Sequence, residues 1–177
     1  MTNFMEKDYK IFEMFKNDWA LVTAGNKDDF NTCTVAWGSL GTIWTRNGNG
    51  AIATVYIHPS RYTNEYFLKN DTFTVSFYSE EYKKQLAYLG SHSGRDEDKV
   101  SAVNFTPVEV HNSITFKEAK CTLVCKKLYQ GQFDKENLAQ EIKDYYISKP
   151  TSFPLDENGE WQTHYMYVGE IFEVIEC

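Results

Sequence analysis

The alternation of apolar and polar residues along the chain predicts mostly β-strands. Each expected strand is a short run of β-branched and aromatic residues, bounded by glycine or by polar residues that favour turns. The strands cover residues 19–25, 32–37, 51–57, 72–78, 121–125 and 165–174. Asn-Gly-Asn-Gly at 47–50 predicts a tight hairpin before the third strand, because Asn-Gly adopts the left-handed turns that join antiparallel strands.

Four short segments have helical character instead. They cover residues 8–18, 63–68, 80–89 and 96–103. Ser79 is the expected N-cap and Gly90 the expected stop of the third helix, and the fourth is expected to follow Ser93. Because most strands are joined by hairpin-like turns and few helices intervene, we expect a mainly β fold. The architecture would be an antiparallel barrel or sandwich with a few peripheral α-helices.

The size and composition of the chain limit its class. Its 177 residues, 42% of them hydrophobic, suffice for a single packed domain spanning 1–177. A net charge of −7 argues against broad binding to nucleic acid or to an anionic membrane, since both need a positively charged face. No apolar stretch approaches the ~20 residues of a membrane helix, and the first residues lack the pattern of a signal peptide. We therefore expect a cytoplasmic protein.

The cysteines and histidines lack the spacing of a metal site or a disulfide framework. The four cysteines form no CxxC pair, and the four histidines form no HxxxH pair. In a strand, the α-carbons of Cys121 and Cys125 would be ~13 Å apart at ~3.3 Å per residue, too far for a disulfide. We expect no bound metal, and we expect these two cysteines to be reduced residues of the core.

Three segments at junctions between expected elements combine hydroxyls, a glycine or proline, and a cation or an aromatic ring. They are Asn-Thr-Cys-Thr-Val-Ala-Trp-Gly at 31–38, Pro-Ser-Arg-Tyr-Thr at 59–63 and Ser-Gly-Arg-Asp-Glu-Asp-Lys at 93–99. In an acidic chain, Arg61, Arg95 and Lys99 among these hydroxyls indicate a local phosphate site, because arginine offers a rigid fork of donors and lysine a point charge. Trp37 and Tyr62 suit a flat ring. The ligand that this chemistry describes is a phosphate joined to an aromatic ring, as in flavin mononucleotide (FMN).

Two of the three segments also have a structural interpretation. Ser93 and Asp96 fit a capping box, and a solvated ion pair on the following helix would account for Lys99. A capped helix N-terminus is itself an anion site, so the capping and binding interpretations are compatible. The segment at 59–63 fits a strand-to-helix turn in which proline fixes the backbone.

Other features favour structural interpretations when each is taken alone. Trp37 fits the core side of an edge strand, and His164 fits a surface position. Residues 48–53 match the dinucleotide fingerprint GxGxxA, but the residues that follow predict a strand. Because that fingerprint needs a helix N-terminus to hold a pyrophosphate, we reject it in favour of the hairpin.

Taken in order along nearly the whole chain, these segments resemble the flavin reductase-like family, in particular its flavoredoxin-type branch. The resemblance is carried by residues 19–25, 31–38, 56–63, 93–96 with 98–99, and 164–171. One such motif alone would be weak evidence for the family, whereas several motifs in register are specific evidence for it. The resemblance implies an FMN-binding split β-barrel, antiparallel and Greek-key-like, that forms a homodimer with FMN near the subunit interface.

The resemblance also implies which residues bind the cofactor. The flavin ring and ribityl chain would be lined by Asn31, Thr32, Cys33, Thr34 and Trp37. The phosphate would be surrounded by Arg61, Tyr62, Thr63, Ser93 and Lys99. The family often has methionine where Cys33 stands, so the contact with the flavin at this position would be smaller. The segment 133–159 matches none of the family motifs, and we expect it to shape the substrate side.

The leading functional hypothesis is an oxidoreductase in which NADH or NADPH reduces the flavin, which then reduces free flavin or a redox partner protein. The cofactor carries out the redox chemistry in such proteins, so we assign no catalytic residue. The alternative is a non-enzymatic FMN carrier or electron-transfer module without a nicotinamide site. A barrel that binds single-stranded nucleic acid by stacking bases on Trp37 and Tyr62 is disfavoured, because such grooves are basic.

Overall fold

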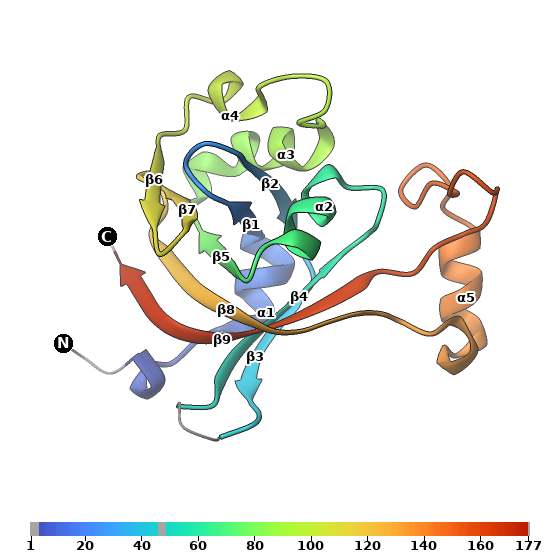
Figure 1. The fold of residues 1–177 in the computed structure, drawn as a ribbon, viewed down its shortest axis with the longest axis horizontal. Coiled ribbons are helices and arrows are strands. Elements are labelled where there is room, and N and C mark those ends of the chain that lie inside the picture. Colours follow the sequence, from blue (N-terminus) through green and yellow to red (C-terminus); the bar gives the residue numbers. More distant parts are fainter. Residues whose placement is uncertain (1–3, 46–48, 177) are drawn as a thin grey trace.

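The chain forms a curved seven-stranded antiparallel sheet, described for residues 4–45 and 49–176 by a computed structural model (Figure 1). The strand order is β2-β1-β5-β8-β9-β4-β3. The strands are β1 (Ala20–Gly25), β2 (Phe30–Val35), β3 (Gly38–Thr42), β4 (Ala51–Ile57), β5 (Thr72–Phe77), β8 (Cys121–Gln132) and β9 (Tyr165–Glu176). Among the described residues, hydrogen bonds do not close the sheet, since β2 and β3 remain its two edges. The predicted antiparallel split barrel is therefore confirmed.

A small second sheet and several short helices surround the barrel. The second sheet pairs β6 (Pro107–Val110) with β7 (Ser113–Phe116). The helices are α1 (Ile11–Glu13), which continues as a π-helical segment over Met14–Asp18, α2 (Tyr62–Lys69), α3 (Lys83–Ser91), α4 (Lys99–Ala102) and α5 (Gln140–Ile147). Short 3-10 turns occupy Phe4–Glu6, Glu80–Tyr82 and Lys135–Asn137. In Figure 1, α3 and α4 lie together at one end of the molecule, while α5 lies at the far end of the long β8–β9 ribbon.

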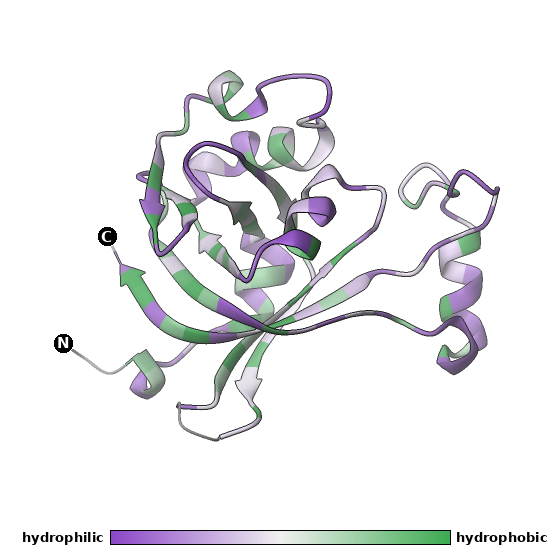
Figure 2. Cartoon of the chain, viewed as in Figure 1, coloured by the Kyte–Doolittle hydropathy of each residue, from purple (hydrophilic) through white to green (hydrophobic). Residues whose placement is uncertain are grey.

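Two apolar clusters hold these elements in place. The main core lies inside the curved sheet, where Val22, Val75 and Leu123 are completely buried. The second cluster joins α3 to the small sheet, with Leu86 of α3 and Phe116 of β7 buried in it. Figure 2 shows the apolar residues following β8 and β9 through the barrel, whereas the loop before α4 is hydrophilic. Burial of each large apolar side chain contributes about 1.5–3 kcal/mol, so α3 is anchored firmly beside β1 and β2.

The sequence predicted the positions of β1, β2, β4, β5, β8 and β9 and of the helices near 8–18 and 63–68, although β8 continues to Gln132, beyond its predicted end at 125. The strand expected at 32–37 ends early, because β2 stops at Val35 and the chain turns at Ala36 and Trp37 into β3. The strands β3, β6 and β7 and the helix α5 were not predicted. In β3, residues 38–42 read Gly-Ser-Leu-Gly-Thr, which contains a single large apolar residue and therefore no alternation.

Two predicted helix boundaries were wrong. The helix expected to stop at Gly90 continues to Ser91, and the side chain of Ser79 makes no capping hydrogen bond. At the next helix, Asp98 is the N-cap in place of Ser93, because its carboxylate accepts the backbone N–H of Ser101 at 3.1 Å. The helix therefore begins at Lys99, three residues later than predicted.

The predicted turn at 47–50 lies partly outside the described residues. Gly50 has a φ of +70°, and Asn49 Oδ1 accepts the backbone N–H of Ala51 at 2.8 Å. The strands β3 and β4 that flank this turn pair in antiparallel register, from Gly38 opposite Val55 to Thr42 opposite Ala51. Asparagine and glycine thus serve the strand reversal rather than a nucleotide.

No disulfide is formed by Cys33, Cys121 or Cys125 within the described part of the chain, in agreement with the prediction for the two cysteines of β8. Cys125 is completely buried, and Cys121 packs against the same core. No described helix is both long enough and apolar enough to cross a membrane. Within residues 4–45 and 49–176, no group of three or more His, Cys, Asp and Glu side chains is placed to hold a metal ion.

Candidate functional site

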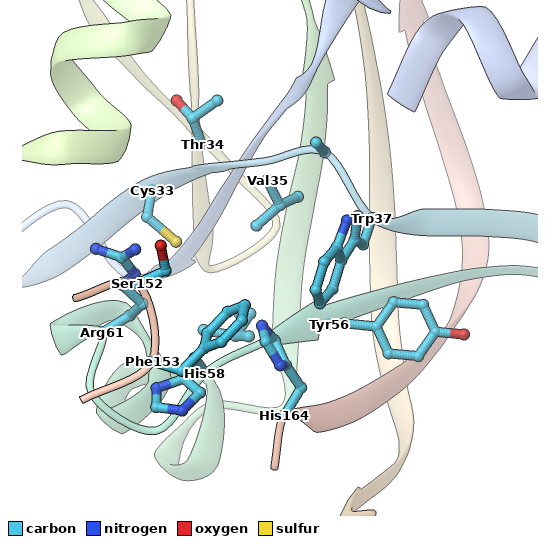
Figure 3. Close-up of a pocket in the computed structure, with 12 residues that line it drawn as sticks. Cys33, Thr34, Val35, Trp37, Tyr56, His58, Arg61, Ser152, Phe153 and His164 are labelled. Carbon is cyan, nitrogen blue, oxygen red and sulfur yellow. The ribbon is translucent and has the colours of Figure 1, made fainter. Parts of the chain in front are cut away.

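Two adjoining cavities open beside β2 and share the side chains of Cys33 and Arg61 (Figure 3). The larger one, which we call the aromatic cavity, has a volume of about 160 Å³ and is lined by Cys33, Thr34, Val35, Ala36, Trp37, Tyr56, Ile57, His58, Arg61, Ser152, Phe153 and His164. The smaller one, the polar cavity, has a volume of about 60 Å³ and is lined by Cys33, Ser60, Arg61, Tyr62, Thr63, Leu89, Gly90, Ser91, His92, Ser93 and Lys99. All the predicted site residues except Asn31 and Thr32 line one or both cavities.

Flat rings form the walls of the aromatic cavity. The rings of Trp37 and His164 are 4.7 Å apart between centroids, and Phe153 lies 6.2 Å from Trp37 and 5.4 Å from His164. Trp37 is 41% exposed, so the core position considered for it is wrong. It projects instead from the turn between β2 and β3, where the chain leaves the sheet. An exposed indole beside a cavity offers its face to a flat ligand.

Arg61 stands where the two cavities meet, and its guanidinium has no partner among residues 4–45 and 49–176. The residue directly precedes α2, and its backbone N–H donates to the carbonyl of His58 at 3.0 Å, which closes the turn. Its side chain makes no hydrogen bond or ion pair with any other described residue. All five N–H donors are therefore available to a ligand, and their fork matches the oxygens of a phosphate.

Lys99 lies at the floor of the polar cavity and closes the C-terminal end of α3. Its side chain is only 4% exposed, and its ammonium donates to the carbonyls of Leu89 at 2.9 Å and His92 at 3.0 Å. The solvated ion pair considered for it is therefore wrong. Burial lowers the pKa of Lys99. Because an ammonium has three donors, one N–H remains for a ligand.

Arg95, the third cation of the predicted cluster, lines neither cavity. Its guanidinium forms an ion pair with Glu65 and donates to the carbonyl of Ser60 at 3.3 Å. It also lies over the ring of Tyr62, with the guanidinium carbon 4.7 Å from the ring centroid. Arg95 thus supports the position of Tyr62 at the rim of the polar cavity.

The glycine of the Ser93-Gly94-Arg95 motif lets its loop lie against β2. A β-carbon on Gly94 would come within 2.1 Å of the side-chain nitrogen of Asn31. That amide is itself fixed, because Thr63 Oγ1 donates to Asn31 Oδ1 at 2.7 Å. Ser93 accepts the backbone N–H of Arg95 at 3.2 Å and so closes a turn at the cavity rim.

The hydroxyls of Thr32 and Thr34 are bound within the protein. Thr32 Oγ1 donates to the carbonyl of Val22 at 3.0 Å and is completely buried. Thr34 Oγ1 donates to the carbonyl of Leu86 at 2.6 Å, which ties β2 to α3. Any contribution of Thr32 to a ligand would therefore come from its backbone. Asn31 and Thr32 both line a separate hollow of about 320 Å³ on the other side of Lys99.

Cys33 forms the shared wall of the two cavities. Its side chain is buried, and burial raises the pKa of the thiol, although nearby Lys99, Thr63 and Arg61 oppose this shift. The thiol is therefore protonated at neutral pH, where it acts as a small apolar wall rather than a nucleophile.

Sequence reasoning did not assign eight lining residues of the aromatic cavity to the site. They are Val35, Ala36, Tyr56, Ile57, His58, Ser152, Phe153 and His164. His164 is 7% exposed, so its predicted surface position is wrong. Ser152 and Phe153 belong to the unmatched segment 133–159, whose two prolines and aromatic residues were its visible signal. They reach the site only because β8 and β9 extend as a ribbon that carries the segment between them.

Comparison with known families identifies this chain. Its sequence matches the flavin reductase like domain over residues 12–176. The chain belongs to this family. The matched residues of this flavin reductase-like protein include all the elements that form the two cavities. No curated protein sequence matches it.

Solved structures share the fold of this flavin reductase-like protein. Flavoredoxin from Methanosarcina acetivorans is 23% identical with a TM-score of 0.65, covering 90% of this chain and 68% of its own. The FMN-binding protein from Thermus thermophilus with bound p-hydroxybenzaldehyde is 20% identical with a TM-score of 0.66, covering 100% and 77%. Component B of nitrilotriacetate monooxygenase from Bacillus cereus is 13% identical with a TM-score of 0.65, covering 100% and 81%. At these low sequence identities, the structural likeness shows a shared fold alone.

The residues present in this flavin reductase-like chain fit FMN. The polar cavity offers the free guanidinium of Arg61 and one N–H of Lys99, which suit a phosphate and have no use for a ligand without one. The aromatic cavity offers the exposed face of Trp37 to a flat ring. The two cavities adjoin at Cys33 and Arg61, so one ligand that carries both a flat ring and a phosphate matches their arrangement.

Proposed function

We propose that this protein is an FMN-binding oxidoreductase that accepts electrons from NADH or NADPH and passes them to free flavin or to a redox partner. The observation that carries the proposal is the junction of an aromatic cavity with a polar cavity at an unpartnered Arg61. Two neighbours in fold support it, one named a flavoredoxin and the other an FMN-binding protein. When bound, FMN would supply the hydride and electron-transfer chemistry.

The protein's own residues would bind and orient the cofactor. Arg61 and Lys99 would hold the phosphate, with the hydroxyls of Ser93 and Tyr62 at the rim of the same cavity. Trp37 would provide a face for the ring, and the segment carrying Phe153 would keep water from the aromatic cavity. The site lies in an acidic chain, so these few cations would also select the phosphate locally.

We expect the purified protein to bind FMN more tightly than riboflavin. Riboflavin has the same ring but no phosphate, so it leaves the donors of Arg61 and Lys99 without their anionic partner. Quenching of flavin fluorescence on titration with protein gives both dissociation constants. Equal affinity for the two flavins would contradict the assignment of the polar cavity to phosphate.

Anaerobic mixing with NADH or NADPH separates the reductase from the alternative, an FMN carrier without a nicotinamide site. The proposed enzyme loses its yellow colour rapidly with at least one of the two nucleotides. A protein that binds FMN tightly but keeps its colour with both would be the carrier. FMN binding is measured beforehand, so a failure to bind flavin is not mistaken for a failure to be reduced.

We also propose that the protein is a homodimer. Phe12 and Trp44 are 90% and 49% exposed, and β2 and β3 present unpaired strand edges, which a second subunit would cover. Light scattering at micromolar concentration should give about twice the 20.6 kDa mass of the chain, with and without flavin. A monomer that still holds FMN tightly would contradict the dimer and leave the phosphate assignment in place.

A further inference from the structure

The segment between β8 and β9 brings one buried tyrosine to the aromatic cavity. Helix α5 is largely exposed, with Ile142 at 41% and Ile147 at 56%, and Tyr146 is its one buried residue. The ring of Tyr146 packs against Phe153 and His164, at centroid distances of 5.1 Å and 5.6 Å. Because Tyr146 is the one residue of α5 that is buried, its packing is the main contact that holds this helix against the site.

The hydroxyl of Tyr146 makes two hydrogen bonds to the same residue. It accepts the backbone N–H of His164 at 3.2 Å, and it lies 2.7 Å from His164 Nδ1. Burial raises the pKa of Tyr146, so the phenol keeps its proton. Among the described residues the phenol has no hydrogen-bond acceptor other than Nδ1, since its second contact is with a backbone N–H, so its own proton is directed to Nδ1. Nδ1 is therefore an acceptor.

His164 is uncharged at neutral pH. Burial lowers its pKa to about 3, and the neighbouring His58 and Arg61 add to this shift. A neutral imidazole with an accepting Nδ1 carries its proton on Nε2. Nε2 has no hydrogen-bond partner in the described part of the chain, and Figure 3 shows the ring projecting among the other aromatic walls of the cavity. His164 Nε2 is therefore a neutral N–H donor of the cavity that has no acceptor among the described residues.

His58, the second histidine of the cavity, has no such free donor. Its Nδ1 accepts the backbone N–H of Ser60 at 3.2 Å and lies 2.7 Å from the hydroxyl of the same serine. Its Nε2 lies 3.2 Å from the carbonyl of Gln162, to which it donates. Both nitrogens of His58 therefore serve to join the turn before α2 to the segment before β9.

We propose that Tyr146 is a positioning residue that fixes the tautomer of His164, so that Nε2–H donates to a carbonyl oxygen on a flat, uncharged ring in the aromatic cavity. Only the identity of the ring rests on the proposed function, and the role of Tyr146 does not. The carbonyl belongs either to the flavin itself or to a substrate that enters beside it. A cavity of about 160 Å³ is close to the about 150 Å³ that accommodates benzene, so it takes one ring, either that of a one-ring substrate or the carbonyl-bearing end ring of the three-ring flavin.

Nitrogen NMR of the histidine rings tests the tautomer directly, because protonated and unprotonated ring nitrogens resonate far apart. In the flavin-free protein, His164 should carry its proton on Nε2 and remain uncharged between about pH 5 and pH 8. Tyr146→Phe removes the donor to Nδ1, which had favoured the neutral ring, so the pKa of His164 should rise. The matched control is Tyr145→Phe, since the Tyr145 hydroxyl has no hydrogen-bond partner among the described residues. Protonation on Nδ1 in the wild type would overturn the proposal.

Calorimetry with 4-hydroxyacetophenone and 4-ethylphenol tests the preference for a carbonyl, because these ligands differ only in C=O against CH₂. If the acceptor is a substrate, the flavin-loaded protein prefers the ketone about two- to tenfold, the range of one neutral hydrogen bond. Tyr146→Phe and His164→Leu lose that preference, and His164→Gln, which keeps an N–H donor, retains part of it. If the acceptor is the flavin, the same two variants instead weaken FMN binding by a similar factor.

Failure of the proposed function and failure of the proposal about Tyr146 give different results. A protein that binds no FMN but shows the expected tautomer contradicts the proposed function and leaves the role of Tyr146 standing. If neither ketone preference nor FMN affinity differs between Tyr146→Phe and Tyr145→Phe, the proposal about Tyr146 is wrong. His164→Leu guards against a folding defect in Tyr146→Phe, because it removes the donor while leaving the tyrosine in place.

Discussion

Replacing Arg61 with alanine is expected to weaken FMN binding about tenfold to a hundredfold and to leave riboflavin binding almost unchanged. A hydrogen bond to a charged group contributes about 1.5–3 kcal/mol, and each 1.4 kcal/mol is a factor of ten. Arg61 has no other protein partner among the described residues, so its removal leaves no buried group without a bond. Fold stability should therefore be unaffected. Fluorescence titration of both flavins measures the effect.

Two further variants make the Arg61 result specific. Lys69→Ala removes the same charge from the exposed end of α2, where the lysine makes no hydrogen bond or ion pair within the described chain, and FMN affinity should change little. Arg61→Lys keeps the charge but loses the fork, so its affinity should fall between those of the wild type and Arg61→Ala. An Arg61→Ala protein that binds FMN as well as the wild type would remove Arg61 from the phosphate site.

Replacing Lys99 with alanine is expected to weaken FMN binding by a similar factor and also to destabilise the fold. The ammonium holds two carbonyls at the end of α3, those of Leu89 and His92. Their loss should lower the free energy of unfolding by about 1.5–3 kcal/mol, the range for hydrogen bonds to a charged group. For a chain of this length, that corresponds to a fall in Tm of roughly 3–12 °C. Thermal unfolding by circular dichroism and FMN titration below the transition measure the two effects separately.

Lys84→Ala is the matched control for Lys99. Lys84 lies exposed on α3, the helix whose C-terminal end Lys99 closes, and makes no hydrogen bond or ion pair with the described residues. Its loss changes the net charge equally. Its Tm and FMN affinity should stay close to those of the wild type. If Lys99→Ala lowered the Tm but bound FMN normally, Lys99 would be a helix cap alone, and Arg61 would remain the phosphate ligand.

The barrel strands could be predicted because each carries its signal locally. The segment 72–78 alternates β-branched and aromatic residues with hydroxyls, and Phe73 and Val75 are buried in the core as this pattern requires. The β3 strand was missed because it is held by pairing with β4 rather than by its own side chains. Helix ends also depended on distant groups, since α3 is closed by Lys99 from the following helix rather than by its own Gly90.

The sequence also indicated most of the candidate site, because cations, hydroxyls and aromatic rings recur at three junctions. It did not distinguish between the two arginines of that set. Arg61 and Arg95 look alike in sequence, but Arg95 is paired with Glu65, whereas Arg61 has no protein partner among the described residues. Nor did it place His164 and Phe153 in one cavity, because these residues meet only through the folding back of the segment between β8 and β9.

The sequence by itself therefore determined the class of fold and the family, and it suggested the FMN ligand proposed above, since these follow from local patterns and from motifs in order. Only the tertiary structure decided which polar groups are free to bind. The hydroxyl of Thr32 donates to a carbonyl of the neighbouring strand β1, and that of Thr34 donates to a carbonyl of helix α3. In our proposal, the proton of His164 is placed by Tyr146 from the distant helix α5. The availability of a donor depends on its neighbours in space, which the order of residues does not reveal.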